Sequence, residues 1–424
     1  MEMARGAGPA DGTDMMPKGD DLTRLGEASP SGDDSGLPDV ELGVLSRARA
    51  LVPRVAARAA AAAKARRLPP ETIAEYRAAG ILRILQPRRF GGLQGRFSLF
   101  SRIVEELTHG CASSGWVYAV LAEHQWILAQ YPEQAQIDVW GADPEAVASS
   151  SLAPRAAAKR VPGGWRLSGR YTFSSGCDYA QWAIIGAFLG EMGDPASIAY
   201  LLVPLAEIEI EDDWHVLGLL GTGSKSLILR DVFVPGHRVV MVSDLFAGTP
   251  PGAAVHPDYP VLRAPRGYLV SYSLPPVLIA LGQRALAIAC RSFADRVSRG
   301  VRRLADSEYV QMTLGEAAAA IDAATLMLHH GRETSTAAVS SGRRISEAEA
   351  LRARRDMTYA QHQVAWAIDR LCELSGARSV YDSDPLSQIR RDVQTMLTHT
   401  AASRQAAMTP YGQMLMARHR ANRG

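Results

Sequence analysis

The spacing of apolar residues changes twice along the chain, and this change restricts the fold more than any other feature of the sequence. In 40–145 apolar residues recur every three or four positions, as between Phe100 and Leu107, which is typical of one face of a helix. In 147–245 the period becomes two, as between Trp165 and Phe173. From about 268 the helical spacing returns and lasts to the end. Because helices, strands and helices are segregated, the pattern predicts an α+β protein that is mostly α, not an alternating βαβ sheet.

These changes predict four segments. Residues 1–38 are rich in Gly, Asp, Ser and Pro, so we expect a disordered tail that cannot bury enough apolar surface to fold. We predict an N-terminal helical domain in 39–146 and a central β domain in 147–245. The remaining 246–424 should form a C-terminal helical bundle, preceded by a loop through 266.

Composition excludes several classes of function. The net charge is +2 and no basic stripe carries interleaved aromatic residues, so we expect no nucleic-acid partner. The four cysteines lie far apart without a CxxC motif or a nearby histidine, which predicts neither a disulfide framework nor a metal site. The chain shows no secretory signal, and Ser and Pro interrupt its longest apolar stretch (268–282), so we expect a cytoplasmic protein without a membrane span.

Several short motifs follow one another in a recognisable order. They are 88–92 (Arg-Arg-Phe-Gly-Gly), 115–117 (Gly-Trp-Val), 122–126 (Ala-Glu-His-Gln-Trp), 149–154 (Ser-Ser-Ser-Leu-Ala-Pro), 167–178 (Leu-Ser-Gly-Arg-Tyr-Thr-Phe-Ser-Ser-Gly-Cys-Asp), 217–225 (Leu-Gly-Leu-Leu-Gly-Thr-Gly-Ser-Lys), 232–235 (Val-Phe-Val-Pro), and 385–392 followed by His399. Together they resemble the group D two-component flavin monooxygenases, such as the oxygenase components of 4-hydroxyphenylacetate 3-hydroxylase and 3-HSA hydroxylase. The resemblance implies the acyl-CoA dehydrogenase fold: an N-terminal helical domain, a central antiparallel β-barrel and a C-terminal four-helix bundle.

One fold of this kind hosts both dehydrogenases and oxygenases, so the site must decide between them. Acyl-CoA dehydrogenases carry a catalytic Glu either near the C-terminal helical segment or near the helix after the barrel. This chain has no Glu in 374–424 or in 212–307. Without a general base for α-proton removal, the dehydrogenase becomes the alternative and the oxygenase the main hypothesis.

For the substrate, the resemblance implies contacts from His124, Ser150 and His399, with His124 and His399 also catalytic. An imidazole with the usual pKa of about 6.5 could accept the proton of a phenol at neutral pH. The alternative for His124 is a core histidine beside Trp126, and for His399 a surface or core histidine. Ser150 could equally belong to a serine-rich strand.

For the flavin, the resemblance implies contacts from Trp116, Ser150, Ser151, Ser174, Ser175 and Arg263. It places the Ser175 hydroxyl against flavin N5, which makes Ser175 catalytic as well. Ser175 could instead be a turn serine, Trp116 a core residue and Arg263 a surface-loop arginine.

Two nearby features also carry alternatives. The 222–224 turn could form an anion-binding nest or a plain turn. The motif residues Arg390, Arg391 and Asp392 could have a role in the site or could simply form an ion-pair cluster on the surface of a helix. Leu220 stands where relatives commonly have Arg, so we expect a flavin or substrate contact to differ.

The implied activity is hydroxylation of an aromatic or phenolic small molecule by reduced flavin (FMNH2 or FADH2) and O2, through a C4a-hydroperoxyflavin. The chain has no nicotinamide-binding fingerprint, so a separate NAD(P)H:flavin reductase is the expected partner. Alternatives are flavin oxygenation of nitrogen or sulfur and a catalytically silent flavin-binding protein. The superfamily's helical packing implies a homotetramer, with 405–424 at an interface.

Overall fold

The computed structural model of the chain describes Asp34 and residues 37–294, 296–298 and 302–421. The expected disordered tail (1–38) lies outside the described residues except for Asp34, Leu37 and Pro38. Leu37 is buried and Asp34 binds arginines of the first two long helices. At these positions the chain already packs on the body of the protein.

The N-terminal helical region surrounds two almost fully buried helices, α4 and α5. Its helices are α2 (Asp39–Ala65), α3 (Pro70–Ala78), α4 (Phe97–Gly110), α5 (Ala112–Leu128) and α6 (Glu133–Trp140), with short 3₁₀ turns at η1 (Ile81–Arg83) and η2 (Arg88–Phe90). Pro70 occupies the first turn of α3. Gly80, with φ of 71°, takes the left-handed conformation just after it, so both ends of this helix follow local backbone preferences.

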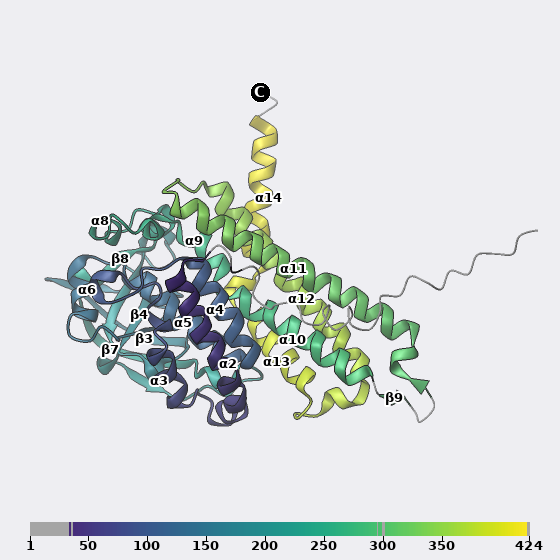
Figure 1. The fold of residues 1–424 in the computed structure, drawn as a ribbon. Helices are drawn as coiled ribbons and strands as arrows, with labels where there is room; N and C mark the ends of the chain where they lie inside the picture. Colours follow the sequence, from purple (N-terminus) through teal and green to yellow (C-terminus); the bar gives the residue numbers. More distant parts are fainter. Residues whose placement is uncertain (1–33, 35–36, 295, 299–301, 422–424) are drawn as a thin grey trace, which may run out of the picture.

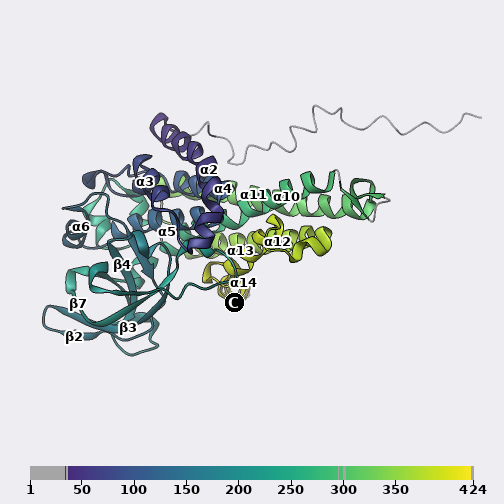
Figure 2. The same cartoon turned by 90° about the horizontal axis from the view of Figure 1, so that it is seen from below.

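The central region consists of two four-stranded sheets with a shared apolar interior (Figures 1 and 2). The first has the order β1 (Ala148–Ser151), β4 (Trp182–Phe188), β5 (Ile198–Pro204) and β8 (Val239–Met241). The second has the order β2 (Lys159–Val161), β3 (Gly164–Ser174), β7 (Lys225–Pro235) and β6 (Glu209–Glu211). The expectation of a purely antiparallel region is wrong at one pair, because β1 and β4 are parallel. The chain leaves β1, forms β2 and β3 in the other sheet, and returns beside β1 in the same direction.

The segment after β8 was expected to be a loop, and here the prediction is wrong. It contains the short helices α7 (Val242–Ala247), α8 (Gly252–Val255) and α9 (Arg266–Leu269), with 3₁₀ turns η8 (Pro260–Arg263) and η9 (Val270–Tyr272). The reason is close packing on the end of α5. A Cβ atom on Gly252 would lie 1.9 Å from the carbonyl oxygen of Ala129, so only glycine permits this approach. Sequence periodicity cannot reveal such a contact.

The C-terminal region is a bundle of long helices that extends away from the sheets (Figure 2). Its helices are α10 (Pro275–Ala294), α11 (Glu308–Ser340), α12 (Glu347–Ser375), α13 (Pro385–Leu397) and α14 (Arg404–Ala421), with a small hairpin of β9 (Val297–Ser298) and β10 (Arg302–Arg303). The stretch Arg266–Ala294 is long and apolar enough to cross a membrane by composition alone. Most of it is buried inside the protein, where α10 packs against α4, α11 and α12, as expected of a core helix.

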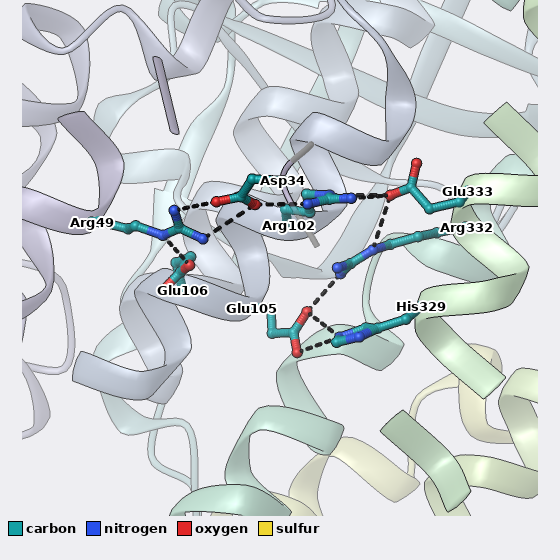
Figure 3. Close-up of polar contacts among 8 residues, drawn as sticks. All are labelled: Asp34, Arg49, Arg102, Glu105, Glu106, His329, Arg332 and Glu333. Atoms are coloured by element: carbon teal, nitrogen blue, oxygen red, sulfur yellow. Dashed lines mark hydrogen bonds and ion pairs between the residues drawn. The ribbon is translucent and has the colours of Figure 1, made fainter. Parts of the chain in front are cut away.

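A buried ionic network joins this bundle to the N-terminal helices (Figure 3). On α4, the fully buried Glu105 accepts hydrogen bonds from Arg332 at 2.6 Å and His329 at 3.0 Å, both on α11. Burial opposes ionisation of Glu105, but these two partners hold its pKa below the usual value. Arg102, also on α4, bridges Asp34 and Glu333 at 2.8 Å each. The network fixes α11 relative to α4 and α2.

Candidate active site

The polar residues of the candidate site come from four parts of the fold. Trp116 and His124 lie on the buried helix α5, Ser150 on β1, Ser175 just after β3, and His399 at the start of the 3₁₀ turn η12 (Thr400–Ala402). A hydrogen bond of 3.0 Å between the hydroxyls of Ser149 and Ser174 ties β1 to the end of β3. The fold therefore brings together residues that lie far apart in the sequence.

His124 and Ser150 form a directed pair. The Nδ1 atom of His124 lies 2.6 Å from the carbonyl oxygen of Ala148, which can only accept, so Nδ1 carries the hydrogen. Nε2 is then an acceptor, and it receives the Ser150 hydroxyl at 3.0 Å. His124 is 3% exposed, and burial lowers its pKa to about 4, helped by the positive charge of Arg266 and opposed by the bond to Ala148. The expectation of a pKa near 6.5 is therefore wrong: His124 is a neutral hydrogen-bond acceptor.

Ser175 belongs to a cluster of buried hydroxyl groups. Its Oγ atom accepts the indole N–H of Trp116 at 3.1 Å and lies 2.7 Å from the Oγ atom of Ser224. Ser224 in turn lies 2.8 Å from the hydroxyl of Thr222. The hydroxyls of the 222–224 turn are thus engaged with Ser175 and with one another.

His399 lies against Trp116, with ring centroids 5.5 Å apart in an edge-to-face arrangement. Its Nδ1 atom accepts the backbone N–H of Ala401 at 3.1 Å, so a neutral ring carries its hydrogen on Nε2. Desolvation and the charge of Arg266 lower the pKa of His399.

Arg266 is the charged residue that the sequence reasoning missed. It lies on α9 with its side chain only 12% exposed, 3.6 Å from the carboxylate of Glu123 and over the ring of Tyr200. Its charge acts on both His124 and His399, so it lies near both histidines. Burial raises the pKa of Glu123, against the effects of Arg266 and of the Ser273 hydroxyl that donates to it. In the sequence it stands only three positions after Arg263, the arginine that was expected to bind the flavin.

The other predicted flavin residues occupy different surroundings. Arg263 is exposed, and its guanidinium donates to the carbonyls of Pro257 and Ala253 at 3.1 and 3.2 Å. The described contacts of Arg263 therefore stay within its own connecting segment and do not reach the serine–histidine cluster. Ser151 donates to the carbonyl of Thr172 at 2.7 Å and Ser174 to Ser149, so both hydroxyls hold neighbouring strands together.

Phe173 is a second residue that the motif alone did not single out. Its side chain is 65% exposed, and its φ of 65° is a conformation that a bulky residue adopts only under constraint. The β3–β7 register shifts between Tyr171 and Ser174, so a bulge accompanies this strained residue. The bulge leaves a large aromatic ring uncovered directly beside Ser174 and Ser175.

These groups fit a reduced flavin. A flavin needs acceptors for its N–H groups, donors for its carbonyl oxygens and apolar surfaces for its rings. Ser175 retains an unused lone pair, while Phe173 and Trp116 offer aromatic surface. The Nε atom of Arg266 is buried without a hydrogen-bond partner among the described residues, so it remains available as a donor.

Comparison with known proteins decides the family. Residues 42–142 match the acyl-CoA dehydrogenase N-terminal domain and residues 276–404 the acyl-CoA dehydrogenase C-terminal domain. The flavin-dependent monooxygenase oxygenase subunit HsaA of Mycobacterium tuberculosis is 35% identical over 371 residues, which are 87% of this chain and 94% of that protein. This chain belongs to the flavin-dependent monooxygenase oxygenase components. The resemblance inferred from the motifs is confirmed, and the relatives support the oxygenase over the dehydrogenase.

Further relatives agree with this assignment. The oxygenase component of an FADH2-dependent resorcinol hydroxylase from Rhizobium sp. is 35% identical over 367 residues, covering 83% of this chain and 89% of that protein. The crystal structure of 3-HSA hydroxylase from Rhodococcus sp. RHA1 superposes with a TM-score of 0.83 at 32% identity, covering 88% of this chain and 97% of that chain. XiaF from Streptomyces sp., solved with FADH2 and glycerol, gives a TM-score of 0.80 at 27% identity, covering 89% and 96%.

Proposed function

We propose that this oxygenase component hydroxylates an aromatic small molecule that carries a phenolic hydroxyl group. One atom of O2 enters the product as the new hydroxyl and the other leaves as water, while reduced flavin gives up two electrons and two protons. When bound, reduced flavin supplies the electrons that activate O2. The observation that carries the proposal is the neutral His124–Ser150 pair, which offers acceptor atoms beside the Ser175 and Trp116 cluster.

His124 and Ser150 orient the substrate in this proposal. The Oγ atom of Ser150 can accept the O–H of a phenol while it donates to His124, and the Nε2 atom of His124 can accept that O–H once the Ser150 hydroxyl rotates away. Since the pKa of His124 is lowered to about 4, His124 polarises the phenol through a hydrogen bond and does not fully remove its proton. A polarised phenol oxygen makes the ring carbons more electron-rich where the new oxygen must enter.

The flavin lies, in this proposal, against Trp116, Phe173 and Ser175, with Arg266 donating to one of its oxygens or to the substrate. We assign this donor role to Arg266 in place of Arg263, because Arg266 has a buried donor atom to spare and Arg263 uses its donors on loop carbonyls. The names of two relatives support reduced flavin as the form bound: a hydroxylase described as FADH2-dependent and a structure with FADH2. Two-component relatives and the lack of a nicotinamide fingerprint in the sequence together support a separate flavin reductase as partner.

The exposed apolar surface of the C-terminal bundle supports a homotetramer. Helix α14 extends away from the body of the chain (Figure 1), and its Leu415 and Met416 are 50% and 60% exposed. A groove of about 330 Å³ lies between α12 and α14, with Tyr359 and Trp366 among its lining residues. Large apolar side chains that stay exposed on neighbouring helices support a subunit interface here. Light scattering should give about four times the 45.7 kDa chain mass, and a monomer mass at micromolar concentration would contradict the tetramer.

The experiment that tests the proposed function compares product with peroxide. Anaerobically reduced FMN or FAD is mixed with the protein, a panel of phenols and O2, and both the hydroxylated product and H2O2 are counted per reduced flavin. His124→Ala should still consume O2 but yield about five- to a hundredfold less product, with H2O2 in its place, because the phenol loses its acceptor. His237→Ala is the control, since His237 pairs with Asp138 and makes none of the described contacts with the cluster. Full product yield in His124→Ala would remove His124 from the site.

A further inference from the structure

A buried carboxylate, that of Glu123, lies next to the substrate pair and has no role in the proposed function. Glu123 directly precedes His124 on α5, and its side chain is 8% exposed. The hydroxyl of Ser273, in the turn between η9 and α10, donates to one of its oxygens. The other oxygen lies 3.6 Å from the guanidinium of Arg266 on α9. Three separate parts of the fold thus hold a negative charge beside a positive one at this end of the site.

The pair of Glu123 and Arg266 differs from an ordinary ion pair of this protein. Arg58, for example, donates two hydrogen bonds to Glu75, at 2.8 and 2.9 Å. The 3.6 Å between Arg266 and Glu123 is longer than a hydrogen bond. The Nε atom of Arg266 is also buried without a partner among the described residues. Glu123 therefore balances the charge of Arg266 without occupying its donors.

The charges around the substrate pair cancel. The pKa of His124 is lowered to about 4 and the pKa of His399 is also lowered, so both rings are neutral at neutral pH. Arg266 stays protonated, since a guanidinium does not lose its proton in proteins. Its charge favours the ionised form of Glu123, although burial raises the pKa of that carboxyl group. These four side chains together carry no net charge.

We propose that Glu123 determines which substrates enter: it cancels the attraction of Arg266 for anions, so that the site takes a phenol without a charged substituent. This inference rests on the proposed function, which places the phenol at His124 and Ser150. A carboxylate on the phenol would meet Glu123 as well as Arg266, and would lose its hydration on entering. A neutral polar group, such as an amide or a ketone, loses less hydration and can still accept the Nε hydrogen of Arg266.

The test compares two phenolic carboxylates, each with its primary amide, which has nearly the same shape but no charge. The acids are 3-(4-hydroxyphenyl)propanoate and 4-(4-hydroxyphenyl)butanoate, whose saturated chains separate the phenol from the substituent. Dissociation constants are measured by anaerobic titration of the protein that holds reduced FMN or FAD, at pH 8 to favour ionised Glu123. The wild-type protein should bind the amide of each pair about tenfold or more tightly than the acid.

Glu123→Gln keeps the shape of the side chain and removes its charge. Arg266 then acts alone on the ligand, so the ratio of acid to amide dissociation constants should fall about tenfold or more below the wild-type ratio. A unit charge a few ångströms away in a buried site is large enough for this change. Glu106→Gln is the matched control, because it removes another buried carboxylate that pairs with an arginine, Arg49, and it should leave the ratio unchanged.

The ratio separates a role in specificity from a structural role, because damage to the fold would weaken the acid and the amide alike. An unchanged ratio in Glu123→Gln would overturn the inference and leave the oxygenase assignment intact. So would a wild-type protein that binds the acids as tightly as the amides, a comparison that needs no variant to fold. Failure of the wild-type protein to bind any of these phenols beside reduced flavin would instead overturn the proposed function, and this inference with it.

Discussion

The folded protein should lose part of its free energy of unfolding as the pH rises through about 6, and Asp392→Asn should remove most of that loss. The carboxyl group of Asp392 is 7% exposed and accepts the Leu219 N–H. Burial raises its pKa to about 6 from the usual 3.8, although that hydrogen bond and the charges of Arg284 and Arg391 favour ionisation. Among the described residues, the buried thiol of Cys111 also faces it, and the pKa of this thiol is raised chiefly by burial.

The sign follows from the raised pKa. A carboxyl group that binds its proton more tightly in the folded state stabilises the fold at low pH, and this contribution disappears as the pH rises through about 6. The shift of roughly two units corresponds to about 3 kcal/mol at about 1.4 kcal/mol per unit, and about 2 kcal/mol of it should be lost between about pH 4.5 and pH 8. Asparagine keeps an acceptor for Leu219 but does not titrate, so the variant should not show this loss.

The assay is denaturant unfolding of both proteins across that pH range, with the difference in free energy of unfolding plotted against pH. The variant should gain about 2 kcal/mol relative to wild type on going from about pH 4.5 to pH 8. Asp322→Asn, at an exposed position on α11, should follow the wild-type profile. Parallel profiles for wild type and Asp392→Asn would show that Asp392 is ionised without cost, and would refute the argument from burial.

Three further predictions concern single charges. Arg332→Met leaves a fully buried carboxylate without its main partner and should cost about 3–5 kcal/mol in denaturant unfolding, whereas Arg343→Met at an exposed pair should cost under about 1 kcal/mol; equal losses would contradict the network in Figure 3. Arg266→Met should weaken binding of reduced flavin or of the phenol about tenfold or more in equilibrium titrations, while Arg263→Met should leave both affinities unchanged. Weaker binding in Arg263→Met alone would show that Arg263, the arginine chosen from the sequence, binds the flavin. Since the pKa of His124 is lowered to about 4, this group stays neutral down to about pH 5, and product yield per reduced flavin should not fall with a midpoint near 6.5.

The order of elements was predictable because each region keeps one period of apolar residues over many positions. The start of α3 at Pro70 and its end near Gly80 followed from local backbone preferences. The parallel β1–β4 pair and the helices after β8 were not predictable, because both depend on contacts between distant parts of the chain. Gly252 shows this, since only the position of Ala129 in the fold makes glycine necessary there.

The candidate site divides in the same way. The motifs named Trp116, His124, Ser150, Ser175 and His399, and the fold places them around two connected polar clusters. The sequence could not show which of Arg263 and Arg266 faces the site, because the two arginines differ in burial, which only the fold determines. Nor could it give the pKa of His124, which depends on how completely α5 is enclosed.

The position of Asp392 depends likewise on tertiary contacts. Spacing on a helix suggested an ion-pair cluster at the surface. The close approach of Gly218 buries the carboxyl group instead, since a Cβ there would lie 2.2 Å from the Arg391 carbonyl oxygen.

The most direct test of the oxygenase assignment is the fate of labelled oxygen. The protein is mixed with anaerobically reduced flavin, a phenol panel and ¹⁸O2, and the products are analysed by mass spectrometry. The account predicts a hydroxylated aromatic that carries one ¹⁸O atom, in an amount that accounts for most of the reduced flavin consumed. Recovery of the label as H2O2 alone, with every phenol unchanged although reduced flavin is bound, would contradict it.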